Sequence, residues 1–230
     1  MAHAELSHPF PAVTDGRNRL YGGSQKLFAR KYVRRSGCGV VACANVLLYM
    51  TRHLPGCEGG LFSALPAEGP VPLAAYNRAC DTLRRRFLPV IPFLGMNGLS
   101  LARGLNLYFR KYRFPYRARW CALGGKRWKR AEAMLRRDIP VILSVGPNLS
   151  PFRTKHKLNF FTKMPDGTYK AAVRTSAHYV TVTGMDDEYL RVSSWGREYY
   201  ISRAEYDGYV RSHSASLVSN IAFIKRVYSP

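Results

Sequence analysis

The sequence predicts an α+β fold, with helices in the first part of the chain and antiparallel strands in the rest. Apolar residues recur at helical spacing up to about residue 137, and short alternating segments bounded by turn residues follow from residue 138 onward. Helices followed by strands are typical of this class. No Pro/Gly/Ser-rich linker separates the two parts. We therefore expect one domain over residues 1–230, with a mainly helical lobe (1–137) and a mainly β lobe (138–230).

The clearest helix is predicted over residues 38–53. Ser36 is a suitable N-cap, and ten of the eleven residues from Val40 to Met50 are apolar. A helix that is apolar on all sides is buried on all sides, so we expect it to run through the middle of the domain. Three amphipathic helices are predicted over residues 71–87, 98–112 and 127–137.

The strands follow from alternation and turn chemistry. Pro165-Asp166-Gly167 predicts a turn between two strands, and Asp186-Asp187 predicts another. The predicted strands are 141–145, 158–162, 168–173, 178–183, 189–193 and one near 217–226. A short helix around 203–211 precedes the last of them.

Composition limits the classes of function. The chain is 47% hydrophobic and 13% aromatic, which excludes a disordered or collagen-like protein. It carries 36 basic and 14 acidic residues, a net charge of +22. Such a charge favours an anionic partner such as nucleic acid, a membrane surface or a wall polymer, with a simple bias toward Arg as the alternative.

The expected compartment is the cytoplasm. The first residues lack the basic start and apolar stretch of a secretory signal, and the longest apolar run, 40–50, is too short to span a bilayer. The five cysteines are odd in number and contain no C-x-x-C pair, so we expect free thiols. His53 and Cys57 alone make a weak metal signal, and we expect no metal or organic cofactor.

Cys38 is the candidate nucleophile. It lies in the first turn of the predicted buried helix, where unpaired N–H groups and the helix dipole favour a thiolate and can donate to an oxyanion. Gly37 and Gly39 leave room beside it for a substrate carbonyl. A structural cysteine at a buried helix end is the alternative, and the deeper Cys43 is expected to be a core thiol.

His178 is the candidate base. It opens an alternating strand 140 residues after Cys38, and a thiolate needs an imidazole beside it to protonate the leaving group. If Asp186-Asp187 forms a two-residue turn, His178 faces Trp195 across the hairpin. Ser193 then lies on the face of His178 and Ser194 on the opposite face, unless a bulge exchanges them. We therefore expect Ser193 to orient the imidazole and Trp195 to cover that bond.

These residues resemble the papain-like cysteine peptidases. The resemblance covers roughly residues 20–200. It rests on Gly37-Cys38-Gly39 opening a helix, on His178 starting a strand followed by Gly184, and on Ser194-Trp195-Gly196. The Pro-Val-Ile strand start at 140–142 brings it closest to the bacteriocin-leader-peptidase-like branch, here as a stand-alone bacterial member. The separation of Cys38 and His178 also matches the papain-like arrangement.

The resemblance implies a papain-like fold with the site in a cleft between the lobes. It also implies an oxyanion-hole glutamine before the cysteine, for which Gln25 is the nearest candidate. Ser193 stands where papain has Asn and this branch usually has Asp. The implied function is a cysteine hydrolase that cleaves a peptide or related amide bond of a peptide or protein substrate. An acyltransferase or cell-wall amidase would use the same Cys-His chemistry.

A basic segment gives a competing hypothesis. Residues 103–137 contain twelve Lys or Arg and one acidic residue, Glu132, interleaved with aromatic residues. This pattern is typical of a single-strand nucleic-acid groove, although aromatics at helical spacing also form cores. The alternative to an enzyme is thus a non-catalytic binding module on the same scaffold. Its basic face would bind an anionic polymer or nucleic acid.

Overall fold

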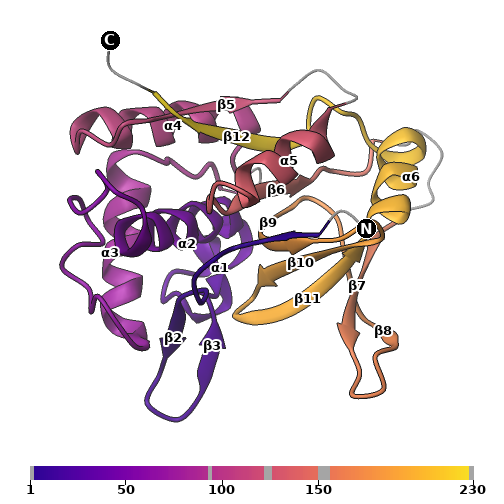
Figure 1. Cartoon of the computed structure of the whole chain (residues 1–230), viewed down its shortest axis with the longest axis horizontal. Helices are drawn as coiled ribbons and strands as arrows, with labels where there is room; N and C mark the ends of the chain where they lie inside the picture. The colour runs from indigo at the N-terminus through magenta and orange to yellow at the C-terminus, as the bar shows by residue number, and fades with distance from the viewer. Residues whose placement is uncertain (1–2, 93–94, 122–125, 150–155, 228–230) are drawn as a thin grey trace.

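Helices and one large antiparallel sheet make up the chain, and the predicted α+β class is confirmed (Figure 1). The structure is a computed structural model, which describes residues 3–92, 95–121, 126–149 and 156–227. Within these residues the main sheet has nine strands, and a second sheet has three. Most helices contact the main sheet, and the helix α2 (Cys38–His53) crosses the centre of the molecule, whereas α3 (Leu73–Arg86) packs on α2 and on the smaller sheet.

The predicted helices form close to their expected bounds. They are α2 (Cys38–His53), α3 (Leu73–Arg86), α4 (Gly98–Lys111), α5 (Arg127–Leu135) and α6 (Arg203–His213). Two short helices before α2 were not predicted, the 3-10 helix η1 (Gln25–Leu27) and α1 (Lys31–Ser36). Gly37 rather than Ser36 is the residue that caps α2, because Ser36 completes α1 and its side chain makes no cap bond.

The main sheet is ordered β5-β12-β6-β9-β10-β11-β7-β8, and β1 also pairs with β9. Its strands are β1 (Ala4–Glu5), β5 (Tyr116–Trp120), β6 (Val141–Val145), β7 (Leu158–Lys163), β8 (Tyr169–Thr175), β9 (His178–Met185), β10 (Tyr189–Ser194), β11 (Arg197–Ser202) and β12 (Ile221–Arg226). The smaller sheet is ordered β3-β2-β4, from β2 (Ala12–Thr14), β3 (Arg19–Tyr21) and β4 (Val71–Pro72).

The sequence analysis missed three strands of the main sheet, β1, β5 and β11, and all three strands of the smaller sheet. β5 lies in the part expected to be helical, yet it pairs antiparallel with β12 at the edge of the sheet. Its residues alternate buried and exposed, which is a strand signal within the basic segment. β11 follows the tight turn at Trp195-Gly196, where both residues have positive φ.

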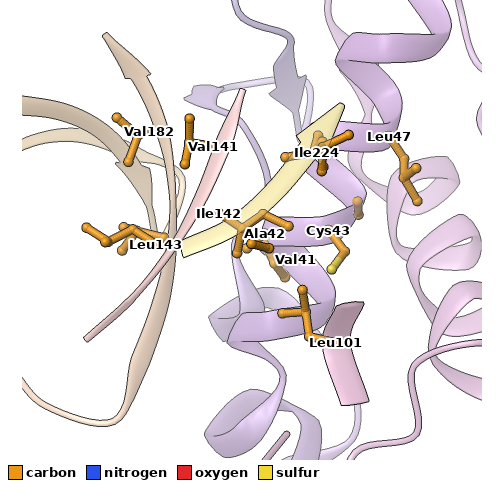
Figure 2. Packing of buried hydrophobic residues seen from close by; sticks show 14 of the residues in the cluster. Val41, Ala42, Cys43, Leu47, Leu101, Val141, Ile142, Leu143, Val182 and Ile224 are labelled. Carbon is orange, nitrogen blue, oxygen red and sulfur yellow. The ribbon is translucent and has the colours of Figure 1, made fainter. Parts of the chain in front are cut away.

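The centre of the core is formed by α2 against the sheet. Every residue from Cys38 to Met50 is buried, as predicted for a helix that is apolar on all sides. Figure 2 shows Ile142 of β6 beside Val41 and Ala42 of α2. Val141 and Leu143, which alternate with Ile142 along β6, lie on the other side of that strand, on the same side as Val182 of β9. This burial fixes the position of the N-terminal end of α2.

The hairpin of β9 and β10 has a register that differs from the predicted one. Its turn spans four residues, 186–189, because the Asp186 side chain accepts from the backbone N–H groups of Glu188 and Tyr189. The pairing then shifts at a bulge between Arg191 and Val192. The four-residue turn keeps the two serines on their predicted faces, and the bulge exchanges them, so the bulge decides which serine reaches His178.

All five cysteines are free and buried, in agreement with the expected free thiols. Among the described residues, no helix is long and apolar enough to cross a membrane.

Candidate active site

One small cavity collects the four predicted site residues. Gln25, Cys38, His178 and Ser193 all line it, although they come from four separate segments of the chain. Its volume is about 10 Å³, roughly the space of one water molecule. The site is therefore closed, and a peptide can enter only if the residues that cover it move.

Cys38 is the first residue of α2 and is held against the start of β9. Burial raises the pKa of its thiol, and the backbone N–H groups of Tyr179, Gly39 and Cys38 act in the opposite direction. The N–H of Tyr179 comes from the residue directly after His178. This contact and the shared cavity both place the thiol beside the first residues of β9. The helix N-terminus favours a thiolate, but desolvation is the larger effect here.

His178 is buried at the start of β9 and packs against two aromatic rings. Its ring stacks on Trp195 with 4.3 Å between centroids, and Phe160 of β7 lies 6.3 Å away. Burial lowers the pKa of His178 to about 3, and the charge of Lys26 acts in the same direction. No carboxylate is among the groups that shift this pKa, so no negative charge among them offsets the free-energy cost of burying a charged imidazole.

Ser194, rather than Ser193, contacts the imidazole. The Oγ atom of Ser194 lies 2.8 Å from Nε2 of His178. The predicted contact of Ser193 with the ring is wrong, because the longer turn and the bulge place Ser193 opposite Thr181. Thr181 lies on the face of β9 that packs on α2, since its hydroxyl donates to the carbonyl of Ala42 at 3.4 Å.

Ser193 instead anchors the loop that carries Gln25. Its hydroxyl donates to the carbonyl of Tyr21 at 2.6 Å. Gly22, with φ of +76°, passes so close that a Cβ there would lie 2.6 Å from the Ser193 oxygen. Only glycine suits this approach, in both conformation and space.

Asn45 completes this anchor from within α2. It is the one polar residue in the apolar stretch 40–50, and its Oδ1 accepts from the N–H of Gly23 at 2.9 Å and from the Tyr76 hydroxyl at 2.7 Å. Its Nδ2 lies 3.5 Å from the Ser193 oxygen. These bonds hold the Gly22-Gly23 segment, and the loop delivers Gln25 to the cavity. There the Gln25 Nε2 donates to the carbonyl of Arg34 at 3.1 Å.

Lys26 and Trp195 lie together beside the imidazole. The Lys26 ammonium lies 5.1 Å from the centre of the Trp195 ring, which stacks on His178 and also contacts the rings of Phe160 and Tyr199. Trp195 has φ of 50°, which is unusual for a bulky residue, and the turn with Gly196 holds it there. The Trp195 ring thus covers the imidazole as expected, and the Lys26 ammonium lies over the Trp195 ring.

The protonation states differ from the sequence-based expectation. A raised pKa for Cys38 and a lowered pKa for His178 make both groups neutral at pH 7. The expected thiolate–imidazolium pair is therefore not the state of this closed site. Three contributors were missed from sequence: the hydroxyl of Ser194, the N–H of Tyr179 and the charge of Lys26. Each depends on a contact between distant segments of the chain. Only the contact of Ser194 was within reach of the sequence, because a bulge in the hairpin would exchange the faces of Ser193 and Ser194.

Comparison with known proteins gives two similar folds. No protein-family model and no curated protein matches the chain. A solved structure described as a C39-like peptidase from Bacillus anthracis is 13% identical, with a TM-score of 0.49, covering 94% of this chain and 98% of that one. The active wild-type interpain A cysteine protease of Prevotella intermedia is 13% identical, with a TM-score of 0.46, covering 99% and 96%.

Proposed function

We propose that the protein is a cysteine hydrolase that cleaves a peptide or related amide bond. The observation that carries the proposal is the meeting of Cys38 and His178 in one cavity, with the N–H of Tyr179 directed at the sulfur. A thiol at a helix N-terminus beside an imidazole is the arrangement that nucleophilic catalysis by cysteine requires. The peptidase resemblance of the sequence points to the same chemistry.

The reaction starts from the neutral pair. As the Cys38 sulfur attacks the carbonyl carbon, the thiol proton passes to His178 and the carbonyl oxygen becomes an oxyanion. Because Nε2 of His178 is engaged by Ser194, we assign Nδ1 as the atom that takes this proton. His178 then gives the proton to the leaving amine as the carbon–nitrogen bond breaks, which leaves a thioester on Cys38.

Hydrolysis of the thioester completes the cycle. His178 takes a proton from water, the hydroxide oxygen bonds to the acyl carbon, and the carbon–sulfur bond breaks with return of the proton to sulfur. The backbone N–H groups of Cys38 and Gly39 are the candidate oxyanion donors, together with the Gln25 amide once it leaves the carbonyl of Arg34.

Each supporting residue then has one role. Ser194 and Trp195 fix the imidazole, and Ser193 and Asn45 fix the loop of Gln25. Entry of substrate requires Trp195 and Lys26 to move, because the closed cavity holds little more than one water.

Alkylation kinetics test the proposal without a known substrate. Cys121 is a matched internal control, because it is 6% exposed against 9% for Cys38 and does not line the cavity of His178. With limiting iodoacetamide at pH 7.5, peptide mapping by mass spectrometry should show Cys38 labelled at least about tenfold faster than Cys121. His178→Gln should remove most of this difference.

Two results would remove the hydrolase proposal. One is equal labelling of Cys38 and Cys121 in the wild-type protein. The other is an undiminished preference for Cys38 in His178→Gln, which would show that exposure rather than the imidazole sets the rate.

A further inference from the structure

A basic groove runs between α4 and β5, outside the candidate active site. In Figure 1 these two elements lie side by side along the top of the molecule. The groove has a volume of about 1040 Å³. Five exposed arginines line it, namely Arg103, Arg110, Arg113, Arg117 and Arg119. A smaller hollow shares Leu107 and Arg110 with it and adds Arg86 and Lys111.

The positive charge of this groove is uncompensated. None of the described residues that line the groove or the hollow is acidic, and none of the five arginines takes part in an ion pair within the described part of the chain. Two other basic residues of the segment 103–137 are engaged elsewhere. Arg127 is buried and donates to the carbonyl of Ser219, and Arg136 pairs with Glu132. The five groove arginines, by contrast, place positive charge without an ion-pair partner along α4 and β5.

The arginines form rows rather than a cluster around one point. Arg117 and Arg119 lie two positions apart on the exposed side of β5, a rise of about 6.8 Å. Arg103 and Arg110 lie two turns apart on α4, a rise of about 10.5 Å. Guanidinium groups bind phosphate in a bidentate manner. Rows of them along a groove fit a linear ligand with a repeating anion.

Arg113 occupies a position at which glycine is favoured. It has φ of 58° and follows the last turn of α4. The N–H of Phe114 donates to the carbonyl of Phe109, and the N–H of Arg113 to that of Arg110, which is the pattern of a helix end closed by a left-handed residue. The chain has an arginine here despite the unfavourable conformation, and its side chain lines the groove.

The edge of β5 is closed to a peptide strand. Asn106 of α4 uses its side-chain amide as a strand partner: Nδ2 donates to the carbonyl of Ala118 at 2.9 Å, and Oδ1 accepts from the N–H of Ala118 at 2.8 Å. A peptide that added to this edge would have to displace Asn106. The groove is therefore suited to a ligand that binds through the arginine side chains alone.

The aromatic residues of the groove are not available for stacking on bases. Phe109, Phe114, Tyr116 and Trp120 are all buried, with at most 9% of each exposed. The aromatic part of the nucleic-acid pattern in the sequence is therefore core, and the basic part is surface. A nucleic acid in this groove would be held by its phosphates, without readout of the bases.

We propose that the α4–β5 groove binds a nucleic-acid strand through its phosphodiester backbone and independently of base sequence. A flat membrane surface fits a hollow groove poorly, and an acidic peptide loses the strand pairing that Asn106 blocks. The groove is distinct from the cavity of Cys38, so this activity does not require hydrolysis.

Salt-dependent binding of a labelled oligothymidylate of about 20 nucleotides tests the proposal. If all five groove arginines contact phosphates, a plot of log K against log salt should have a slope of about −3.5. The double variant Arg117→Ala/Arg119→Ala should weaken binding at least about tenfold in low salt and make the slope shallower by about 1.4. Arg117→Lys/Arg119→Lys should keep most of the slope but bind severalfold more weakly, because lysine lacks the bidentate fork.

A matched control removes two positive charges from the surface outside the groove. Arg17 lies in the β2–β3 loop and Lys170 on β8, and both are exposed. In Figure 1 the β2–β3 hairpin and β8 lie away from α4 and β5. Arg17→Ala/Lys170→Ala should bind almost as the wild-type protein does. Equal weakening in both double variants would overturn the proposal in favour of net charge alone.

Three further arms decide what the groove recognises. Oligoadenylate should bind within about threefold of oligothymidylate, and Cys38→Ala should bind both as wild type does. Polyglutamate, or vesicles of one-third phosphatidylserine in phosphatidylcholine, should compete poorly at matched charge. A tenfold base preference, or competition by either of these anions as strong as that of nucleic acid, would overturn it.

Discussion

The two ends of α2 both carry ionisable side chains, but they are built in opposite ways. At the N-terminal end, Cys38 and His178 are buried, and the imidazole has a hydroxyl partner in Ser194. At the C-terminal end, His8 is about half exposed and its Nδ1 lies 2.8 Å from an oxygen of Asp138. The end that resembles a catalytic site therefore lacks the carboxylate, and the other end has one.

The C-terminal end is a tether for the N-terminal segment of the chain. Tyr49 donates to Asp138, which also accepts from the N–H of Ser7 at 2.6 Å. The rings of His8 and His53 stack with 4.5 Å between centroids. A fully satisfied carboxylate of this kind holds structure in place. The comparison teaches that the His–carboxylate pair of this molecule, His8 with Asp138, stabilises the fold, whereas the candidate catalytic histidine, His178, is buried without a carboxylate.

The largest expected effect is at Cys38. Cys38→Ala should lower turnover of any peptide or amide substrate at least about 10³-fold, because the nucleophile is lost. Tyr49→Phe, at the other end of the same helix, should leave turnover within about twofold. Steady-state kinetics on both variants checks this. Residual activity of Cys38→Ala above about one per cent would mean that another group attacks the substrate.

The second effect is on acid stability. Burial lowers the pKa of His178 from 6.5 to about 3, so between these values the unfolded chain binds a proton that the folded chain does not. Stability must therefore fall as the pH falls from 6.5 toward 3. At pH 4.5 the loss due to His178 should be about 3 kcal/mol relative to pH 7.5.

Urea denaturation at the two pH values measures this loss. His178→Gln can keep a hydrogen bond to Ser194 and should be less sensitive to acid by that amount. His53→Gln is the comparison at the other end, because burial also lowers the pKa of His53, followed by the charge of His8 and opposed by Asp138. Its effect should be smaller, since His53 is only partly buried. An acid sensitivity of His178→Gln equal to that of wild type would contradict a buried neutral imidazole.

The third effect separates the two serines. Ser194→Ala removes the oxygen at 2.8 Å from the imidazole and should lower kcat by about tenfold. It should also change the pH dependence of kcat, which a loss of stability alone would not do. Ser193→Ala should act through the Gln25 loop instead. We expect it to cost about 1 kcal/mol in unfolding free energy, through the lost bond to Tyr21.

The result that would reverse this assignment is a larger fall in kcat for Ser193→Ala than for Ser194→Ala. The two variants remove the same atom from adjacent residues, so each serves as the control for the other.

The smallest effect is that of Tyr49→Phe on stability. The hydroxyl donates to Asp138 and accepts from the N–H of His8 at 3.2 Å. Asp138 keeps His8 and Ser7 as partners, so the loss should be about 1 kcal/mol by urea denaturation. A loss above about 3 kcal/mol would show that this end of the helix does more than tether the N-terminal segment.

The sequence was sufficient where one local pattern decided the structure. The bounds of α2 followed from an apolar stretch that ends at Arg52 and His53, and β6 followed from a β-branched segment after Pro140. β5 was missed because its alternation, Tyr-Arg-Ala-Arg-Trp, was interpreted as a basic aromatic patch. Its partner β12 lies about 100 residues later, which no local pattern reveals.

The site was predictable in its residue types but not in its register or its charge. Cys38, His178, Gln25 and Ser193 meet, yet the four-residue turn at Asp186 and the bulge after Arg191 come from side-chain bonds and packing that spacing does not encode. The same holds for protonation. A helix dipole is visible in the sequence, whereas the desolvation that outweighs it depends on everything packed around Cys38 and His178.

The bulge between Arg191 and Val192 makes the site depend on the pairing register of the hairpin in a way that substitution of either serine does not probe. Its extra residue is Thr183 of β9, which the pairing with β10 skips between Gly184 and Val182. In a hairpin that paired Val192 with Thr183, Ser193 would face Val182 and lie on the side of His178, and Ser194 would point at α2. A relative could therefore exchange the partner of the imidazole by losing the bulge, with every side chain in the hairpin conserved.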